Sequence, residues 1–124
     1  MRRIAMKIGL VLALMAFALP AQTQGNMTVV YKPVNVRHLN GVVTYSGSRE
    51  GIMGAIVEDC DPMYKHILAS TTTDRSGRFS FPHVKYGSVH YLNVRYPGWD
   101  LTRIPVTIRL FAKPELHKYL VIAN

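Results

Sequence analysis

The clearest pattern in the chain is a strict alternation of apolar and polar residues in its last third. Residues 88–96 place two sets of side chains on opposite faces, one holding His90, Leu92, Val94 and Tyr96, the other Tyr91, Asn93 and Arg95. Residues 104–110 repeat the pattern, with Ile104, Val106, Ile108 and Leu110 against Pro105, Thr107 and Arg109. A period of two predicts half-buried β-strands. Proline has no N–H to donate, so we expect the second strand at a sheet edge.

A turn signal within Thr73–Pro82 follows the β-branched run Thr71-Thr72-Thr73 and precedes a second short strand. Asp74 can hydrogen-bond to nearby main chain, and Gly77 can adopt a positive φ without a Cβ clash. Phe79 and Phe81 then share one face of the following strand. The segment predicts a β-hairpin corner whose second strand ends at Pro82.

Weaker alternation predicts more strands in residues 34–45, 54–60, 64–73 and 116–122. Gly41 lies inside the first of these and indicates a bulge or a close backbone approach. No helical spacing of apolar residues follows the first 21 positions. About seven short strands separated by turn signals predict an all-β protein, an antiparallel β-sandwich or barrel.

The first 21 residues have the layout of a secretory signal peptide. Arg2, Arg3 and Lys7 precede an uncharged apolar run, and Ala21 offers a small residue for cleavage. Removing 21 of the 124 residues leaves 103, which is one domain of ordinary size. We expect residues 22–34 to form a flexible lead or an edge strand and residues 35–124 to form the domain. The protein is then secreted or periplasmic, with no membrane span after cleavage.

Charge and cysteine content narrow the possible partners. Without the three basic residues of the signal peptide, 12 of the 15 lysines and arginines remain against seven acidic residues, a net charge of +5. These charges are scattered, which predicts a solvated basic surface and argues against a nucleic-acid partner. Cys60 is the only cysteine, so an intramolecular disulfide is impossible. Its thiol is either buried, the expectation we favour, or available for an intermolecular bond.

Four segments resemble, in the expected order, the motifs of the carboxypeptidase regulatory-like domain. They are Gly41-Val42-Val43-Thr44, Gly54-Ala55-Ile56-Val57, Thr73-Asp74-Arg75-Ser76-Gly77-Arg78-Phe79, and Gly87 with Leu92, Val94 and Pro97-Gly98-Trp99. The resemblance covers about residues 37–112 and implies a transthyretin-like β-sandwich, grouped with carbohydrate-binding-like folds. It departs from the family pattern at Tyr45, at His90 and in the link Asp61–Lys65. Domains of this family are accessory modules without an active site of their own.

Catalytic and metal-binding motifs are absent from the sequence. The five histidines show none of the i, i+2 or i, i+4 pairs typical of metal sites. The chain ends Val121-Ile122-Ala123-Asn124, whereas hydroxyisourate hydrolases of the same fold end in Tyr-Arg-Gly-Ser. The iron-ligand spacing of intradiol dioxygenases is also missing. We therefore expect no enzyme activity, no cofactor and no metal.

Aromatic and polar side chains indicate a possible ligand site. Tyr91, Asn93 and Arg95 should point away from the core, and Trp99 should lie near the rim of the sandwich. Aromatic rings pack on the apolar faces of sugars, while amide and guanidinium groups bond the hydroxyls. The alternative for Trp99 is a cap over the core. We expect a binding module for carbohydrate or for a cell-envelope or surface protein; the alternative is an assembly module that pairs through an exposed strand edge.

Overall fold

The structure is a computed structural model that describes residues 27–116 and 120–122. The predicted signal peptide, residues 22–26 of the predicted lead, and residues 117–119 and 123–124 lie outside the described part, so the assignments made there stay predictions. Within the described part every regular element is a β-strand. None of its segments is a helix that could cross a membrane.

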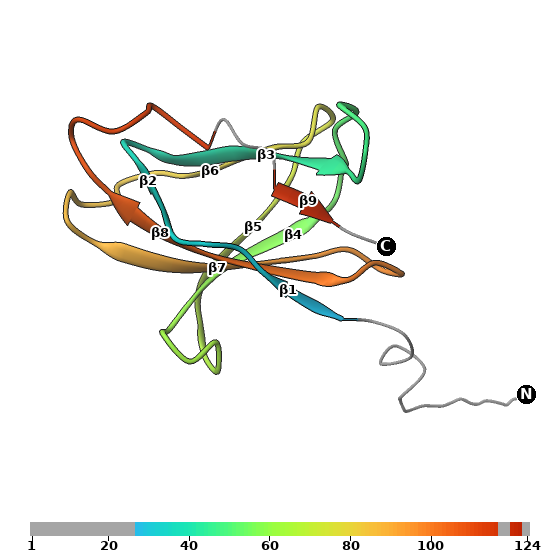
Figure 1. Ribbon diagram of the computed structural model, residues 1–124, viewed down its shortest axis with the longest axis horizontal. Helices are drawn as coiled ribbons and strands as arrows, with labels where there is room; N and C mark the ends of the chain where they lie inside the picture. The colour runs from blue at the N-terminus through green and yellow to red at the C-terminus, as the bar shows by residue number, and fades with distance from the viewer. Residues whose placement is uncertain (1–26, 117–119, 123–124) are drawn as a thin grey trace, which may run out of the picture.

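Nine strands form two sheets in the described part of the chain (Figure 1). They are β1 (Thr28–Val30), β2 (Val34–Val36), β3 (Leu39–Tyr45), β4 (Ile56–Cys60), β5 (Ile67–Thr72), β6 (Arg78–Phe81), β7 (Val89–Arg95), β8 (Leu101–Ile108) and β9 (Leu120–Ile122). The larger sheet has the order β1-β8-β7-β4-β5, with β2 also paired to β8; the smaller has the order β6-β3-β9. The prediction of an all-β protein is confirmed.

The sheets are mixed rather than purely antiparallel. The central ladder β8-β7-β4-β5 is antiparallel, as expected. However, β1 and β2 pair with β8 in parallel, and β9 pairs with β3 in parallel. These parallel pairs join segments far apart in the sequence, which local turn signals cannot reveal.

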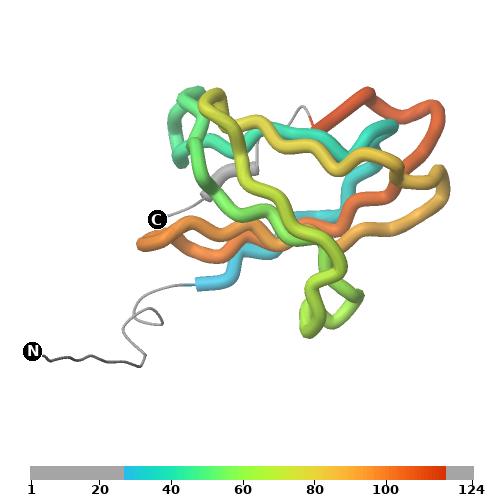
Figure 2. Tube along the Cα trace, turned by 180° about the vertical axis from the view of Figure 1, so that it is seen from behind, coloured from blue at the N-terminus to red at the C-terminus, as the bar shows by residue number. Residues whose placement is uncertain are grey.

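The two sheets enclose one hydrophobic core, which lies between the layers seen in Figure 1 and from behind in Figure 2. Both sheets contribute side chains to this core. Leu39 and Val43 of β3 are fully buried, as are Leu92 of β7 and Ile108 of β8, and all four belong to one cluster. The predicted alternation is confirmed for Leu92 and Val94, which are buried, and for every second residue of β8 through Ile108. The strands form because this period buries one face of each ladder.

The end of β8 and its proline differ from the prediction. The strand stops at Ile108, and a turn follows in which the Ala112 N–H donates to the Arg109 carbonyl. Leu110 is therefore 48% exposed instead of continuing the buried face. β8 is also not an edge strand. Pro105 is tolerated because it falls between the β1 pairing, which ends at Arg103, and the β2 pairing, which begins at Val106.

The Thr73–Pro82 segment forms a corner, but it is not a hairpin. β5 pairs with β4 in the larger sheet, whereas β6 pairs with β3 in the smaller one. One Asp74 carboxylate oxygen accepts the N–H groups of Ser76 and Arg78, each at 2.9 Å. Gly77 has φ of 83°, as predicted. The corner therefore carries the chain from one layer to the other.

The Asp74 corner makes stability depend on acid pH. The backbone hydrogen bond from Arg78, followed by the Ser76 side chain, lowers the pKa of Asp74 below its usual 3.8. A carboxylate with a depressed folded-state pKa stabilises the fold above its unfolded pKa and loses that contribution as pH falls through the folded value. We expect Asp74→Ala to lower the melting temperature at pH 7, with the difference from wild type shrinking below about pH 4. A constant difference across thermal melts from pH 7 to pH 2 would contradict this role.

Candidate functional site

Three of the four predicted ligand residues lie on the outer face of the larger sheet. Tyr91, Asn93 and Arg95 alternate along β7 with the fully buried Leu92 and Val94, so they point away from the core. The predicted direction of these side chains is therefore confirmed. Their surroundings differ from a free ligand surface, because neighbouring strands and the β4–β5 loop supply partners to them.

A buried carboxylate organises the polar part of this face. Glu58 of β4 is 4% exposed and lies opposite Asn93 in the β4–β7 ladder. Asn93 donates to Glu58 Oε1 at 2.8 Å, and Arg95 donates to Oε2 from Nε and Nη2 at 3.1 and 3.0 Å. Asn93 Oδ1 also accepts from Arg103 Nε at 3.2 Å. Both the NH₂ group and the carbonyl oxygen of the Asn93 side chain are thus hydrogen-bonded within the protein. The positive charge of Arg95 compensates the negative charge of Glu58.

Sequence reasoning missed Glu58 as a site residue, although it predicted a strand over residues 54–60. The structure shows Glu58 and Asp59 inside β4, and both are buried. A strand carrying two adjacent acidic residues gives no local signal of burial. The decisive factor is the pairing of β4 with β7, which brings Asn93 and Arg95 beside the carboxylate.

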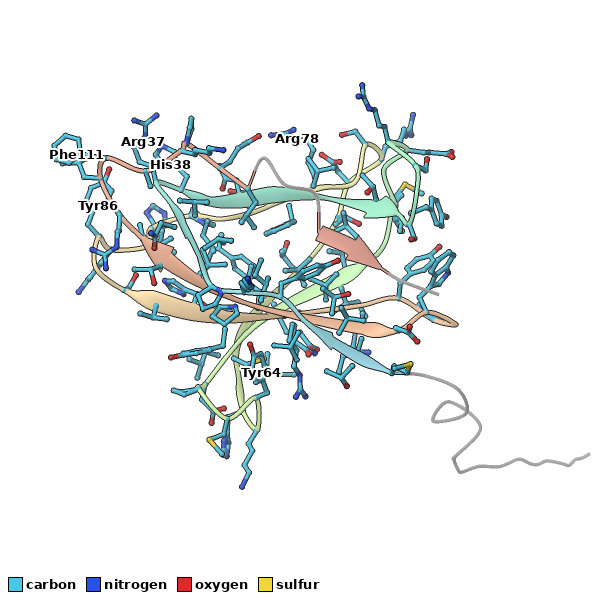
Figure 3. The ribbon with its side chains drawn as sticks, in the orientation of Figure 1. Arg37, His38, Tyr64, Arg78, Tyr86 and Phe111 are labelled. Carbon is cyan, nitrogen blue, oxygen red and sulfur yellow. The ribbon has the colours of Figure 1, made fainter. Side chains whose placement is uncertain are left out.

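An aromatic side chain from the β4–β5 loop packs on the same face. The Tyr64 ring meets Tyr91 edge to face, with centroids 5.9 Å apart, and the guanidinium carbon of Arg103 lies 4.4 Å from the Tyr64 centroid. Figure 3 shows Tyr64 beneath the larger sheet, on the side away from the smaller one. Burial raises the pKa of Tyr64, and its hydroxyl oxygen is buried without a partner among the described residues. The rings of Tyr64 and Tyr91 therefore cover each other instead of lying open to a sugar.

The fourth predicted ligand residue belongs to another environment. Trp99 follows β7 in the turn toward β8, is half-buried, and packs against the core. Its ring lies 5.3 Å from that of Tyr45, at an interplanar angle of 54°. Since Tyr45 belongs to the smaller sheet, Trp99 spans the two layers. This position fits the alternative of a core cap.

No family model matches the chain, and no curated protein or solved structure is significantly similar to it. The resemblance to the carboxypeptidase regulatory-like domain therefore stays a prediction. What the molecule can do has to be argued from its own geometry.

A second polar cluster, which the sequence did not predict, joins three side chains in the order of a serine-hydrolase triad. Asp59 Oδ2 lies 2.6 Å from His90 Nδ1, and His90 Nε2 lies 2.8 Å from Ser88 Oγ. The His90 and Asp59 side chains are 15% and 11% exposed. The cluster ties the start of β7 to the end of β4, on the face of the larger sheet that holds Leu92.

The hydrogen bonds around this cluster support a structural role better than a catalytic one. A serine nucleophile gives its proton to histidine, and nearby N–H groups stabilise the resulting oxyanion. Here Ser88 Oγ donates to the Lys85 carbonyl at 2.5 Å. The N–H groups of Gly87 and Ser88 are also engaged, by the carbonyls of Ile108 and Lys85. The same residues that would build an oxyanion site are thus used to hold the β6–β7 connection against β8.

Metal and thiol chemistry find little support in the described residues. Within residues 27–116 and 120–122, no group of three or more histidine, cysteine or acidic side chains is placed to hold a metal ion. Cys60 is 3% exposed, and burial, then the charges of Glu58 and Asp59, raise the pKa of its thiol. Of the two expectations for Cys60, burial is the one that the structure shows.

Proposed function

We propose that this protein is an exported, non-enzymatic β-sandwich of the carboxypeptidase regulatory-like, transthyretin-like type, and that it assembles with another chain through the free edge of β5. The observation that carries this proposal is the character of that edge. β5 is the last strand of the larger sheet, and five of its six residues are exposed. Figure 2 shows this yellow-green strand crossing the front of the molecule.

The β5 edge lacks two of the features that usually prevent strand pairing. Charged residues, prolines and bulges protect natural edges. The sequence of β5 is Ile-Leu-Ala-Ser-Thr-Thr, with no charge and no proline. Ile67 and Leu68 are 57% and 69% exposed. One irregularity is present: Asp59 pairs with Ala69 and Cys60 with Ile67, so Leu68 is the extra residue of β5, near the start of the strand.

The partner we propose is a second copy of the chain, paired antiparallel through β5. Such a two-fold interface is self-complementary, since each residue meets a fixed counterpart in the other copy. Aligning Ile67 with Thr72 of the second copy brings no like charges opposite each other. In an antiparallel pair the numbers of opposite residues have a constant sum, which is 139 for Ile67 and Thr72. Continuing the alignment by two residues therefore places Lys65 opposite Asp74 of the second copy. The flanking charges would then attract.

Sedimentation velocity over a range of concentrations tests this proposal. We expect wild type to form a concentration-dependent dimer, and Leu68→Lys to be monomeric with an unchanged melting temperature. Lysine at an edge strand opposes pairing, and Leu68 is too exposed for the change to affect the core. Met53→Lys is the matched control, since Met53 is 60% exposed in the β3–β4 loop. A wild-type monomer at every concentration, or equal dimers for both variants, would contradict the role of β5.

Carbohydrate binding on the outer face is the second candidate. It is favoured by Arg95, whose side chain is 52% exposed although it pairs with Glu58, and by Arg103, whose guanidinium lies over the Tyr64 ring. A glycan array on the mature protein separates the candidates. Saturable sugar binding by a monomer supports this face, and a dimer that binds no glycan supports the edge.

A further inference from the structure

One end of the molecule exposes apolar side chains that the core does not use. It is built from the β2–β3 turn, the β6–β7 connection and the β8–β9 connection, and we call it the Phe111 tip. Phe111 is 95% exposed, Tyr86 57% and Leu110 48%. Figure 3 shows Phe111 and Tyr86 at this end of the sandwich, with Arg37 and His38 beside them. An aromatic ring left almost entirely in water is unusual and marks an interaction site when other apolar groups adjoin it.

Backbone hydrogen bonds hold the three segments of the Phe111 tip together. The Arg37 N–H donates to the Lys113 carbonyl at 2.6 Å, and the Arg109 N–H donates to the Val36 carbonyl at 2.8 Å. On the other side, the Gly87 N–H donates to the Ile108 carbonyl at 2.7 Å. Tyr86, Leu110 and Phe111 also line one shared surface hollow. Backbone hydrogen bonds to both neighbouring segments therefore hold the turn that carries Phe111.

The charged side chains around these apolar residues are mainly basic. Lys85, Arg109 and Lys113 are exposed, and Arg37 is half-buried. The nearby carboxylate is Glu115, and both of its oxygens accept from Arg78 Nη2, at 2.9 and 2.8 Å. The other six acidic residues lie on β4 or in the connections β3–β4, β4–β5, β5–β6 and β7–β8. Among residues 27–116 and 120–122, the Phe111 tip thus combines a protruding apolar group with basic side chains that have no acidic partner.

We propose that the Phe111 tip docks on an anionic lipid surface. Phe111, Leu110 and Tyr86 would enter the boundary between headgroups and acyl chains, where aromatic side chains are favoured. Lys85, Arg109 and Lys113 would meet the lipid phosphates, since basic residues beside an inserted group add electrostatic attraction to anionic lipids. A protein partner would need a pocket to receive this protruding ring, whereas a fluid lipid surface accommodates it without one. The site lies apart from β5, so lipid docking and edge pairing are independent.

Vesicle sedimentation tests the proposal with the mature chain. We expect binding to vesicles of phosphatidylcholine mixed with phosphatidylglycerol, much weaker binding to phosphatidylcholine alone, and a decline with added salt because charges at a surface are screened. Phe111→Ser should weaken binding about 10-fold by removing the inserted ring. The double variant Arg109→Gln, Lys113→Gln should weaken it about 25-fold and flatten the salt dependence.

Two control variants carry the same chemical changes elsewhere. Met53→Ser removes an exposed apolar side chain from the β3–β4 loop, and Arg49→Gln removes an exposed positive charge from the same loop. Both should bind the mixed vesicles as wild type does, and melting curves should show all variants folded. Failure of wild type to bind the mixed vesicles would overturn the proposal. So would equal binding by Phe111→Ser and Met53→Ser, or a loss in the Arg49→Gln control equal to that of the double variant.

Discussion

Replacing Gly77 by alanine is expected to destabilise the fold by about 2–6 kcal/mol, a large part of the stability of a small domain. Two effects combine at this position. The backbone has φ of 83°, which side-chain-bearing residues rarely adopt. An added Cβ would also lie 2.6 Å from the Val43 carbonyl oxygen and 2.7 Å from the Gly51 Cα, so two backbone segments would have to move apart. Urea unfolding monitored by circular dichroism measures the difference.

Gly54→Ala is the matched control because it separates these two effects. Gly54 has nearly the same φ, 85°, but an added Cβ meets nothing within 4 Å. Its cost should therefore be the conformational strain alone, about 1–2 kcal/mol. Equal losses for the two variants would show that the contact of the corner with Gly51 and Val43 does not contribute.

The second large effect is expected for Phe79→Ala, at about 3–5 kcal/mol. Phe79 is 4% exposed and belongs to the core, with the Phe81 ring 6.3 Å away between centroids. A Cβ at Gly41 would come within 2.9 Å of the Phe79 ring, so the ring fills the space that this glycine leaves. Truncation removes apolar contacts and leaves a cavity that the two sheets cannot easily close.

Phe111→Ala makes the same chemical change at a side chain that is 95% exposed. We expect it to alter stability by no more than about 0.5 kcal/mol, as for ordinary surface positions. Thermal and urea unfolding of both variants give the comparison. Comparable losses at Phe79 and Phe111 would contradict the arrangement of the core and would also remove the structural basis for the Phe111 tip.

Much of the strand architecture could be predicted because burial has a local signature. In β7 the alternation of Leu92 and Val94 with Tyr91, Asn93 and Arg95 specifies which side chains face the core. The positive φ of Gly77 could likewise be predicted, because it depends on the missing side chain of glycine. These features require no knowledge of which strand lies next to which. At Gly41 the sequence indicated a bulge or a close backbone approach, whereas it is the Phe79 side chain that lies against this glycine.

The composition of the candidate site could not be predicted, because it depends on strand pairing. The predicted ligand set held three outward residues of β7, but their partners come from β4, from β8 and from the β4–β5 loop. Nothing near Glu58 in the sequence indicates that Arg95 neutralises it, and nothing near Tyr64 indicates that it covers Tyr91. Burial of a charge is decided by the groups that surround it in space.

The sequence by itself determined the all-β class, the direction of the side chains along β7 and β8, and the sharp corner at Gly77. Each follows from the two-residue period of a strand or from the backbone freedom of glycine. Only the tertiary structure decided that the corner joins two sheets, that Asp59, His90 and Ser88 meet, and that β5 and Phe111 are left exposed. These depend on contacts between residues far apart in the chain, and a local pattern carries no information about which distant segment will fill the space beside it.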